Sequence, residues 1–272
     1  MRHDTSSGEA SSTALTAAEA QETPRLELRG IAKSFGAVRA LNGVNLDVYP
    51  GEVIGLVGDN GAGKSTLVKV MSGNLHPYEG EIRFEGQPAE LRSPTAAAEL
   101  GIATVYQDLA LCDNLDVVGN LFLGRATTRW SGPLRTLDQE TMERRTLDVL
   151  RSLGVRTVRD VRAPVASLSG GQRQSIAVAR AVMWNSKVVL LDEPTAALGV
   201  EQTRQVLELV KRLRTQGLSV VLISHNLADV FEVADRVIVL RLGQVAGNFE
   251  TAGTSAEEVI AAITGAEFGR TA

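Results

Sequence analysis

The chain has 272 residues, of which 44% are apolar, so it can bury a sizeable core in one large or two small domains. Its formal net charge of −4 lacks the basic excess of a dedicated nucleic-acid-binding protein, and we expect no nucleic acid among its partners. Cys112 is the one cysteine, which excludes an intrachain disulfide and fits a reducing compartment; we expect it to be a small buried hydrophobe.

Two further features bear on location. No stretch reaches the roughly 18 to 20 consecutive apolar residues that are needed to span a bilayer. Residues 1–24 are rich in Ala, Ser, Thr and Glu and lack the apolar segment of a secretory signal, so we predict a disordered tail there. The expected location is cytoplasmic unless a partner holds the protein at a membrane.

From Arg25 onward, short apolar runs alternate with amphipathic stretches that end at Gly, Pro or capping residues. The first half predicts, in order, strands at 26–28, 44–48 and 53–57, a helix at 66–71, a strand at 81–84, a helix that starts at Ser93-Pro94 and a strand at 102–106. The second half predicts a helix from Asp138 to Gly154, a helix at 169–183, a strand at 188–191, a helix at 201–216, a strand at 218–223, a short helix and a strand at 237–240.

This alternation predicts an α/β fold around a mostly parallel sheet, whose ligands bind at the carboxyl ends of the strands. The stretch from about 108 to 165 departs from this alternation of strands and helices, and the apolar positions of its helix share one face. We interpret this stretch as a helical insertion into the α/β core. No internal repeat is visible, so the chain is expected to hold one such domain.

Residues 58–65 follow a predicted buried strand, open a helix and fit the phosphate-loop pattern GxxxxGK[ST]. Glycines let the backbone point successive N–H groups at phosphates, and the helix adds its positive dipole end. Lys64 would supply charge to the β and γ phosphates, and Ser65 would ligate Mg²⁺. The expected ATP-binding residues here are Gly58, Asp59, Asn60, Gly61, Ala62, Gly63, Lys64, Ser65 and Thr66.

Two adjacent acids, Asp192 and Glu193, directly follow the apolar run 188–191. Such carboxylates are costly at the end of a buried strand unless they meet a cation or water. We expect Asp192 to support Mg²⁺ and Glu193 to polarise the attacking water. The alternative is a helix-capping acid pair.

The run Leu168-Ser169-Gly170-Gly171-Gln172 matches the signature motif of ATP-binding cassette proteins, and the chain resembles that family over residues 25–250. The resemblance implies a P-loop NTPase (RecA-like) core with an N-terminal antiparallel β subdomain and an inserted helical subdomain, followed by a helical extension at 251–272. In this family two cassettes pair head to tail, so that the signature of one closes over the γ-phosphate held by the other. The nucleotide-binding residues implied by the motif are Ser169, Gly170, Gly171 and Gln172.

Three more positions match the family's order of motifs. Gln107 follows the strand at 102–106, where the resemblance implies a contact to Mg²⁺ or water and a link to the membrane partner. His225 follows the strand at 218–223 and Ser224, and is implied to reach the γ-phosphate. Phe35 matches the aromatic residue that stacks on adenine, although a lone Phe is usually part of a core.

One position departs from the family pattern. Where the family commonly carries Ser-Ala-Leu-Asp after Pro194-Thr195, this chain has Ala196-Ala197-Leu198-Gly199, which puts in doubt a cross-dimer contact through that aspartate. This variant is similar to the sugar-importer branch, and residues 105–115 look closest to importers of fructose and related monosaccharides.

The resemblance implies a cycle in which two cassettes close around two MgATP molecules, Glu193 activates water, and Lys64, His225 and Mg²⁺ stabilise the developing charge. The expected partners are a second copy of the cassette, transmembrane permease subunits and a solute-binding protein, with the chain bound to the cytoplasmic face of the cell membrane. The alternatives are an importer of another small solute such as an amino acid, a soluble non-transport cassette ATPase, and a regulatory cassette that binds ATP without turnover.

Overall fold

The structure, a computed structural model of the chain, describes residues 23–131 and 134–266. Most of the predicted N-terminal tail and the last residues of the predicted C-terminal extension therefore lie outside the described residues. Within the described part, no helix combines the length and apolar character that a membrane span requires.

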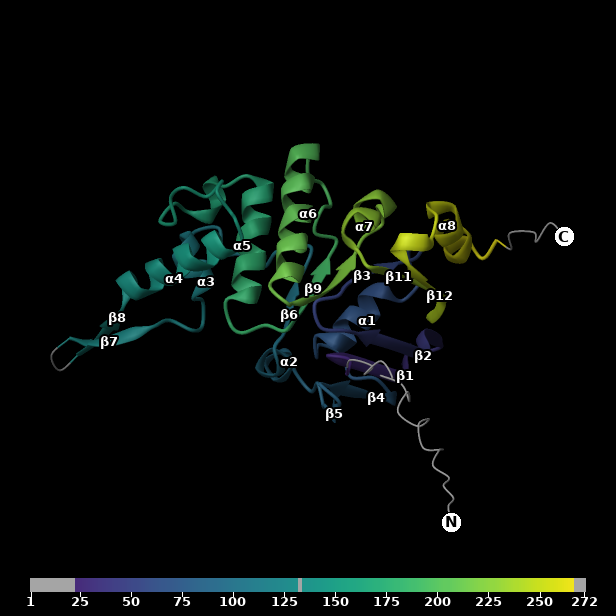
Figure 1. Cartoon of the computed structure of the whole chain (residues 1–272). Helices are drawn as coiled ribbons and strands as arrows, with labels where there is room; N and C mark the ends of the chain where they lie inside the picture. The colour runs from purple at the N-terminus through teal and green to yellow at the C-terminus, as the bar shows by residue number, and fades with distance from the viewer. Residues whose placement is uncertain (1–22, 132–133, 267–272) are drawn as a thin grey trace, which may run out of the picture.

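A six-stranded sheet forms the centre of the fold, in the order β12-β11-β3-β10-β9-β6 (Figure 1). Five strands are parallel, and β12 adds an antiparallel edge. Every residue of β3 and β10 is buried, as expected for parallel strands that are covered on both faces. The strands are β3 (Val53–Val57), β6 (Ile102–Val105), β9 (Val188–Asp192), β10 (Ser219–Ile223), β11 (Arg236–Arg241) and β12 (Gln244–Glu250).

A four-stranded antiparallel sheet, in the order β2-β1-β4-β5, packs against the central sheet. It confirms the predicted N-terminal β subdomain, but its first two strands are longer than predicted and include Phe35 at the end of β1. Its strands are β1 (Leu26–Phe35), β2 (Val38–Val48), β4 (Glu79–Phe84) and β5 (Gln87–Pro88), and the helices α1 (Lys64–Met71) and α2 (Pro94–Leu100) lie near it.

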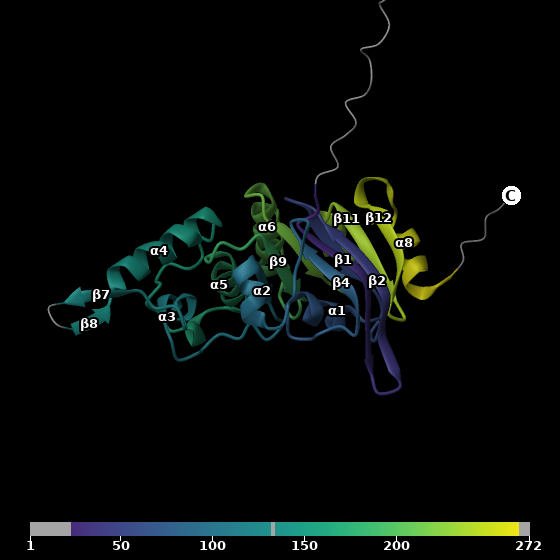
Figure 2. The ribbon, with the colours of Figure 1, turned by 90° about the horizontal axis from the view of Figure 1, so that it is seen from below.

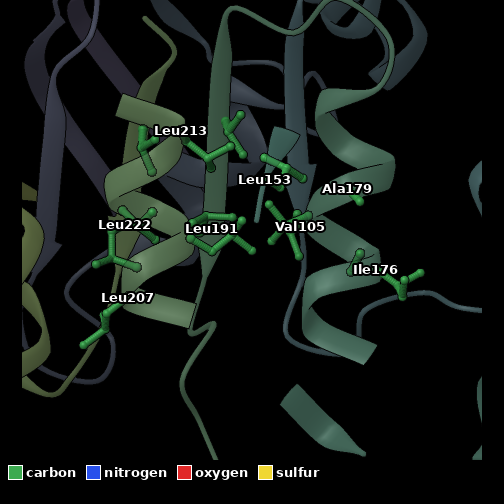
Figure 3. Packing of buried hydrophobic residues seen from close by; sticks show 14 of the residues in the cluster. Val105, Leu153, Ile176, Ala179, Leu191, Leu207, Leu213 and Leu222 are labelled. Atoms are coloured by element: carbon green, nitrogen blue, oxygen red, sulfur yellow. The ribbon is translucent and has the colours of Figure 1, made fainter. Parts of the chain in front are cut away.

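The period-two geometry of the strands divides the apolar residues between two cores. In β3, Val53 and Val57 join the core beneath the long helices, whereas Ile54 and Leu56 join the core shared with the antiparallel sheet. Figure 3 shows the first core, where Leu191 and Val105 of the sheet lie between Leu207 and Leu213 of one helix and Ile176 of another. The helices on this face are α5 (Gly170–Val182), α6 (Val200–Thr215) and α7 (Leu227–Val233).

The insertion is not purely helical, which corrects the prediction for residues 108–165. Besides α3 (Val117–Leu121), α4 (Gln139–Ser152) and a 3-10 turn η1 (Val165–Ser167), it contains a β-hairpin of β7 (Thr128–Ser131) and β8 (Leu134–Leu137). Thr and Trp residues favour strands, but this run is short and lies within helical surroundings, so its strand signal is weak. Figure 2 shows this hairpin at one end of the molecule and α8 (Ala256–Thr264) at the other.

Most other predicted boundaries are confirmed to within about two residues, because capping residues mark them. Ser93 Oγ accepts a hydrogen bond from the Ala96 N–H, and Asp138 Oδ1 accepts one from the Thr141 N–H. The short turn η2 (Thr251–Gly253) and α8 follow β12. Cys112 is half-buried rather than fully buried, beside the buried Asn120, whose Oδ1 accepts from the Cys112 N–H.

Gly55 lets α7 lie directly on β3. A Cβ at this position would lie 2.2 Å from Val230 Cγ1 and 3.5 Å from Ala234 Cβ. We expect Gly55→Ala to lower the free energy of unfolding by about 1–3 kcal/mol through overpacking. Gly55→Ala combined with Val230→Ala should recover part of the loss. Gly253→Ala, where a Cβ meets nothing within 4 Å, is the matched control.

Denaturant unfolding of the four chains followed by circular dichroism checks this prediction. A Gly55→Ala chain that is as stable as the Gly253→Ala chain would contradict the close packing of α7 on β3.

Candidate functional site

The phosphate-loop residues connect β3 to α1 through backbone conformations that favour glycine. Gly58 has φ +146° and Gly63 has φ +108°. A Cβ on Gly58 would lie 2.1 Å from the Leu240 carbonyl oxygen, and one on Gly63 would lie 2.6 Å from that of Ala40. The motif's glycines are therefore required by both conformation and space, as the loop pattern predicted.

The N-terminus of α1 lacks the side-chain cap that α2, α4 and α5 have. Ser93, Asp138 and Ser169 cap α2, α4 and α5 with side-chain oxygens, but α1 has Gly63 at this position and no side-chain cap. The first N–H groups of a helix need an acceptor. A helix end that is left without a side-chain acceptor is a suitable place for a phosphate group.

The Lys64 ammonium lies across the loop. Its Nζ donates to the carbonyl oxygens of Gly58, at 2.5 Å, and Asp59, at 3.0 Å. These contacts hold the lysine at the centre of the loop, where its charge is available to an anion bound by the same loop.

The two carboxylates lie at the carboxyl end of β9. Asp192 is its last residue, and burial together with the adjacent Glu193 raises the pKa of its carboxyl group, while Lys64 and Lys69 act in the opposite direction. Glu193 has φ +51°, an uncommon conformation for a residue with a side chain, and its N–H donates to the Ile223 carbonyl oxygen at 3.0 Å. The pair is therefore not a helix cap: it follows the sheet and faces the phosphate loop's lysine.

His225 meets Glu193 from the next strand of the sheet. Its Nδ1 lies 2.7 Å from Glu193 Oε2, and 17% of the Glu193 side chain is exposed against 73% for His225. The contact arises because β9 and β10 are parallel neighbours, so that the turns after them lie side by side. Sequence reasoning placed both residues near the γ-phosphate but did not predict their direct contact.

One open cleft of about 580 Å³ gathers most of the expected residues. The expected residues that line it are Phe35, residues 59–66, Gln107, Asp192 and Glu193. Phe35 is 52% exposed and is therefore not a core residue. The side chains that sequence reasoning missed in the lining are Val38, Arg39, Ala40, Ile223 and Leu242.

The missed residues come from three places: the start of β2, the last residue of β10 (Ile223) and the turn after β11. Val38, Arg39 and Ala40 begin the strand after Phe35, so their place follows from the β1–β2 pairing rather than from any motif. Leu242 follows β11, and its φ of +48° belongs to a tight turn before β12. The place of Leu242 follows from the pairing of β11 with β3, which positions the turn after β11 beside the phosphate loop.

The signature residues do not line this cleft. Ser169 is exposed and caps α5: its Oγ accepts from the Gln172 N–H at 3.4 Å, and Gln172 Oε1 accepts from the Ser169 N–H at 2.9 Å. Gln172 Nε2 also donates to the Thr157 carbonyl oxygen at 2.6 Å. Within one chain, the phosphate loop and the signature are therefore separate surfaces.

Gly199, the position that departs from the family pattern, is the N-cap of α6 and has no side chain to cap the helix. Its N–H donates instead to Gln202 Oε1 at 3.3 Å. The neighbouring Val200 is 91% exposed. The glycine thus preserves the helix start through Gln202 while removing a carboxylate from an exposed turn.

The donor set of the cleft fits Mg²⁺ bound together with phosphates. Among the described residues there is no cluster of three His, Cys, Asp or Glu side chains that could hold a metal alone. Mg²⁺ commonly takes one or two carboxylates, substrate phosphates and waters rather than a complete protein cage. Ser65, Gln107 and Asp192 supply oxygen ligands of that kind in one cleft.

Comparison with known proteins gives a consistent set of relatives. The profile of the family described as ABC transporter matches residues 41–196. The fructose import ATP-binding protein of Rhizobium meliloti is 47% identical over 91% of this chain and 96% of its own length. The xylose/arabinose import ATP-binding protein of Sulfolobus acidocaldarius is 45% identical over 90% of this chain and 96% of its own length.

Among solved structures, a dimeric bacterial ABC transporter cassette superposes with a TM-score of 0.70 and 26% identity, covering 84% of this chain and all of the cassette. The phosphate loop, the acid-ending strand and the capped signature helix thus occur together in a fold that solved cassettes share. On these grounds the chain belongs to the ABC transporter family, as one of its ATP-binding cassettes.

Proposed function

We propose that this chain is the ATPase subunit that powers import of a monosaccharide. The observation that carries the catalytic part is the geometry of one cleft, in which Lys64 of the phosphate loop, Asp192 and Glu193 face the same space and His225 contacts Glu193. The substrate class is supported by relatives named for the import of fructose and of xylose or arabinose. All three sugars are monosaccharides, and the match covers 96% of the length of each relative.

In the proposed reaction the chain's own groups bind and orient ATP. The N–H groups of residues 59–66 and the Lys64 ammonium hold the phosphates, and Phe35 stacks on the adenine ring. Glu193 Oε2 accepts a proton from, or orients, the water that attacks the γ-phosphate in line. His225, held against the same carboxylate, donates toward the developing charge on the γ-phosphate oxygens.

Mg²⁺ would be held by Ser65 Oγ and the Gln107 side chain, with Asp192 supporting its water shell. When bound, it supplies charge neutralisation at the β and γ phosphate oxygens. In the chain alone, burial and then the adjacent Glu193 raise the Asp192 pKa, and the charge of the ion would oppose both effects.

The proposed assembly contains two cassettes, two permease subunits or domains and a solute-binding protein. Because the signature lies outside the chain's own cleft, a second copy has to supply it, and the simplest arrangement is a two-fold symmetric dimer. Gln107 and the insertion at 108–165 are proposed to transmit closure to the permease. The chain would then be a peripheral protein on the cytoplasmic face of the membrane.

Removal of the proposed base gives the first catalytic prediction. Glu193→Gln keeps the shape of the side chain but cannot accept a proton, so we expect hydrolysis to slow by about 10² to 10⁴ while MgATP still binds. Phosphate release and fluorescent nucleotide titration measure the two quantities. Near-normal turnover would remove Glu193 from this role.

Asp192→Asn should stabilise the folded chain but weaken its use of Mg²⁺ in ATP binding. Burial and Glu193 raise the pKa of Asp192, so the charged form destabilises the folded chain once the pH exceeds the usual range of aspartate. We expect Asp192→Asn to raise the Tm of the nucleotide-free chain more at about pH 7.5 than at about pH 4. We also expect it to weaken the Mg²⁺ dependence of ATP binding by about 10-fold to 100-fold.

Thermal melts at the two pH values and titrations of ATP with and without Mg²⁺ decide this point. An unchanged Mg²⁺ dependence would show that Asp192 does not support the ion.

Mixing of two inactive variants tests the shared site. Lys64→Ala disables the phosphate loop, and Ser169→Arg blocks the signature, so each alone should lack activity. About half of the mixed population should be heterodimers that each hold one intact site, giving up to about a quarter of the wild-type rate. If a heterodimer with one intact site cannot hydrolyse ATP, nucleotide trapped in that site should still reveal that the site has formed.

Thr215→Arg, which adds an arginine at an exposed position at the far end of α6, is the control for the arginine introduced at position 169. Full activity of Ser169→Arg as a monomer, established by light scattering, would refute the shared site.

A further inference from the structure

A buried carboxylate that the proposed reaction does not use lies directly behind the Glu193–His225 pair. Asp229, on the first turn of α7, is 7% exposed. Burial of an aspartate is costly unless hydrogen bonds compensate for the loss of water. Both of its carboxylate oxygens have such partners, and the partners come from the two turns that carry the pair.

The first contact reaches the turn after β9. Asp229 Oδ2 accepts a hydrogen bond from Thr195 Oγ1 at 2.7 Å, and Thr195 is two residues after Glu193. The second contact reaches the turn after β10. Asp229 Oδ1 accepts from Asn226 Nδ2 at 2.9 Å, and Asn226 directly follows His225.

These contacts close a ring. The backbone connects Glu193 to Thr195, and the Thr195 hydroxyl is hydrogen-bonded to Asp229. Asp229 is hydrogen-bonded to Asn226, which the backbone connects to His225. The 2.7 Å contact between the His225 and Glu193 side chains completes the ring. Asn226 is fixed in turn, because its N–H donates to Ser224 Oγ at 3.0 Å and its Oδ1 accepts from the Ala228 N–H at 3.1 Å. The two turns are therefore connected twice, by the Glu193–His225 contact and through Asp229.

The turn that carries Glu193 needs such support. Glu193 has φ +51° and Ala197 has φ +58°, and both carry side chains. Residues in this region persist only where their surroundings fix them. Glu193 has the backbone bond to Ile223 on one side, and the Thr195 hydroxyl on Asp229 supplies a second anchor two residues later.

We propose that Asp229 is a positioning residue for ATP hydrolysis: by binding Thr195 and Asn226 together, it sets the distance and orientation of Glu193 relative to His225. The inference rests on the proposed function, since it assigns Glu193 as the base. A misplacement of about 1 Å at a catalytic group can lower a rate by as much as about 100-fold, so the expected effect is on turnover rather than on nucleotide binding.

Thr195→Val is the sharpest variant, because it removes the hydroxyl and keeps the shape. We expect kcat to fall by about 10-fold to 100-fold, with the KM for ATP and the nucleotide affinity within about twofold of wild type. Asp229→Asn should lower kcat similarly. Thr195→Ser keeps the hydroxyl, so its kcat should be close to that of the wild type. Glu232→Gln, one turn further along the solvent side of α7 and paired with Lys211 there, is the matched control and should leave kcat unchanged.

A purely structural role is separated from positioning by the Glu193→Gln background. If Asp229 acts through Glu193, Thr195→Val should lower the residual rate of the Glu193→Gln chain by less than about twofold. If the hydrogen bond serves only the fold, the fractional loss should be the same in both backgrounds, and this result would overturn the proposal. Rates are measured well below the Tm of each variant, so that loss of folded protein does not enter.

Two further outcomes separate this inference from the proposed function. Wild-type kcat in both Thr195→Val and Asp229→Asn, while Glu193→Gln is slow, would overturn the positioning role alone. Normal turnover of Glu193→Gln itself would overturn the proposed base, and the positioning role with it.

Discussion

The structure depends on two adjacent carboxylates at the end of a strand that is otherwise buried. Asp192 and Glu193 repel each other, and burial raises the pKa of Asp192, so the chain alone holds this pair at a cost. The positive groups that offset it are Lys64, in the loop opposite, and the cation that accompanies a triphosphate. We propose that MgATP completes this charge arrangement and that its binding offsets the cost of holding the two carboxylates together.

The parallel sheet brings these groups together. β3, β9 and β10 are neighbours, so the phosphate loop, the two acids and His225 follow from strands that end at one edge. Gly55 allows α7 to lie on this sheet, and α7 presents Asp229 to the turns that carry Glu193 and His225. Packing in the core and orientation at the site are therefore linked through one short helix.

Much of this arrangement could be predicted from sequence, because motifs with a fixed local context report their own structure. The loop of residues 58–65 between a strand and a helix, the helix that begins at Ser169 and the strand at 188–191 were placed correctly by pattern and spacing. The β7–β8 hairpin was missed, since a short run of Thr and Trp carries little signal inside helical surroundings. The Thr195–Asp229 contact and the cleft residues Arg39 and Leu242 could not be predicted, because they arise from the pairing of different strands and helices. The Asn226–Asp229 contact is local to the start of α7, and it was missed because no motif marks it.

We propose that the nucleotide site is completed by a second copy of the chain. The most direct test of this proposal is an experimental structure of the slow Glu193→Gln chain with MgATP. We expect a two-fold dimer in which each γ-phosphate contacts Lys64 of one chain and lies at the Ser169 end of α5 of its partner. A nucleotide bound in the cleft of a monomer, or a dimer whose signatures lie away from the phosphates, would contradict it.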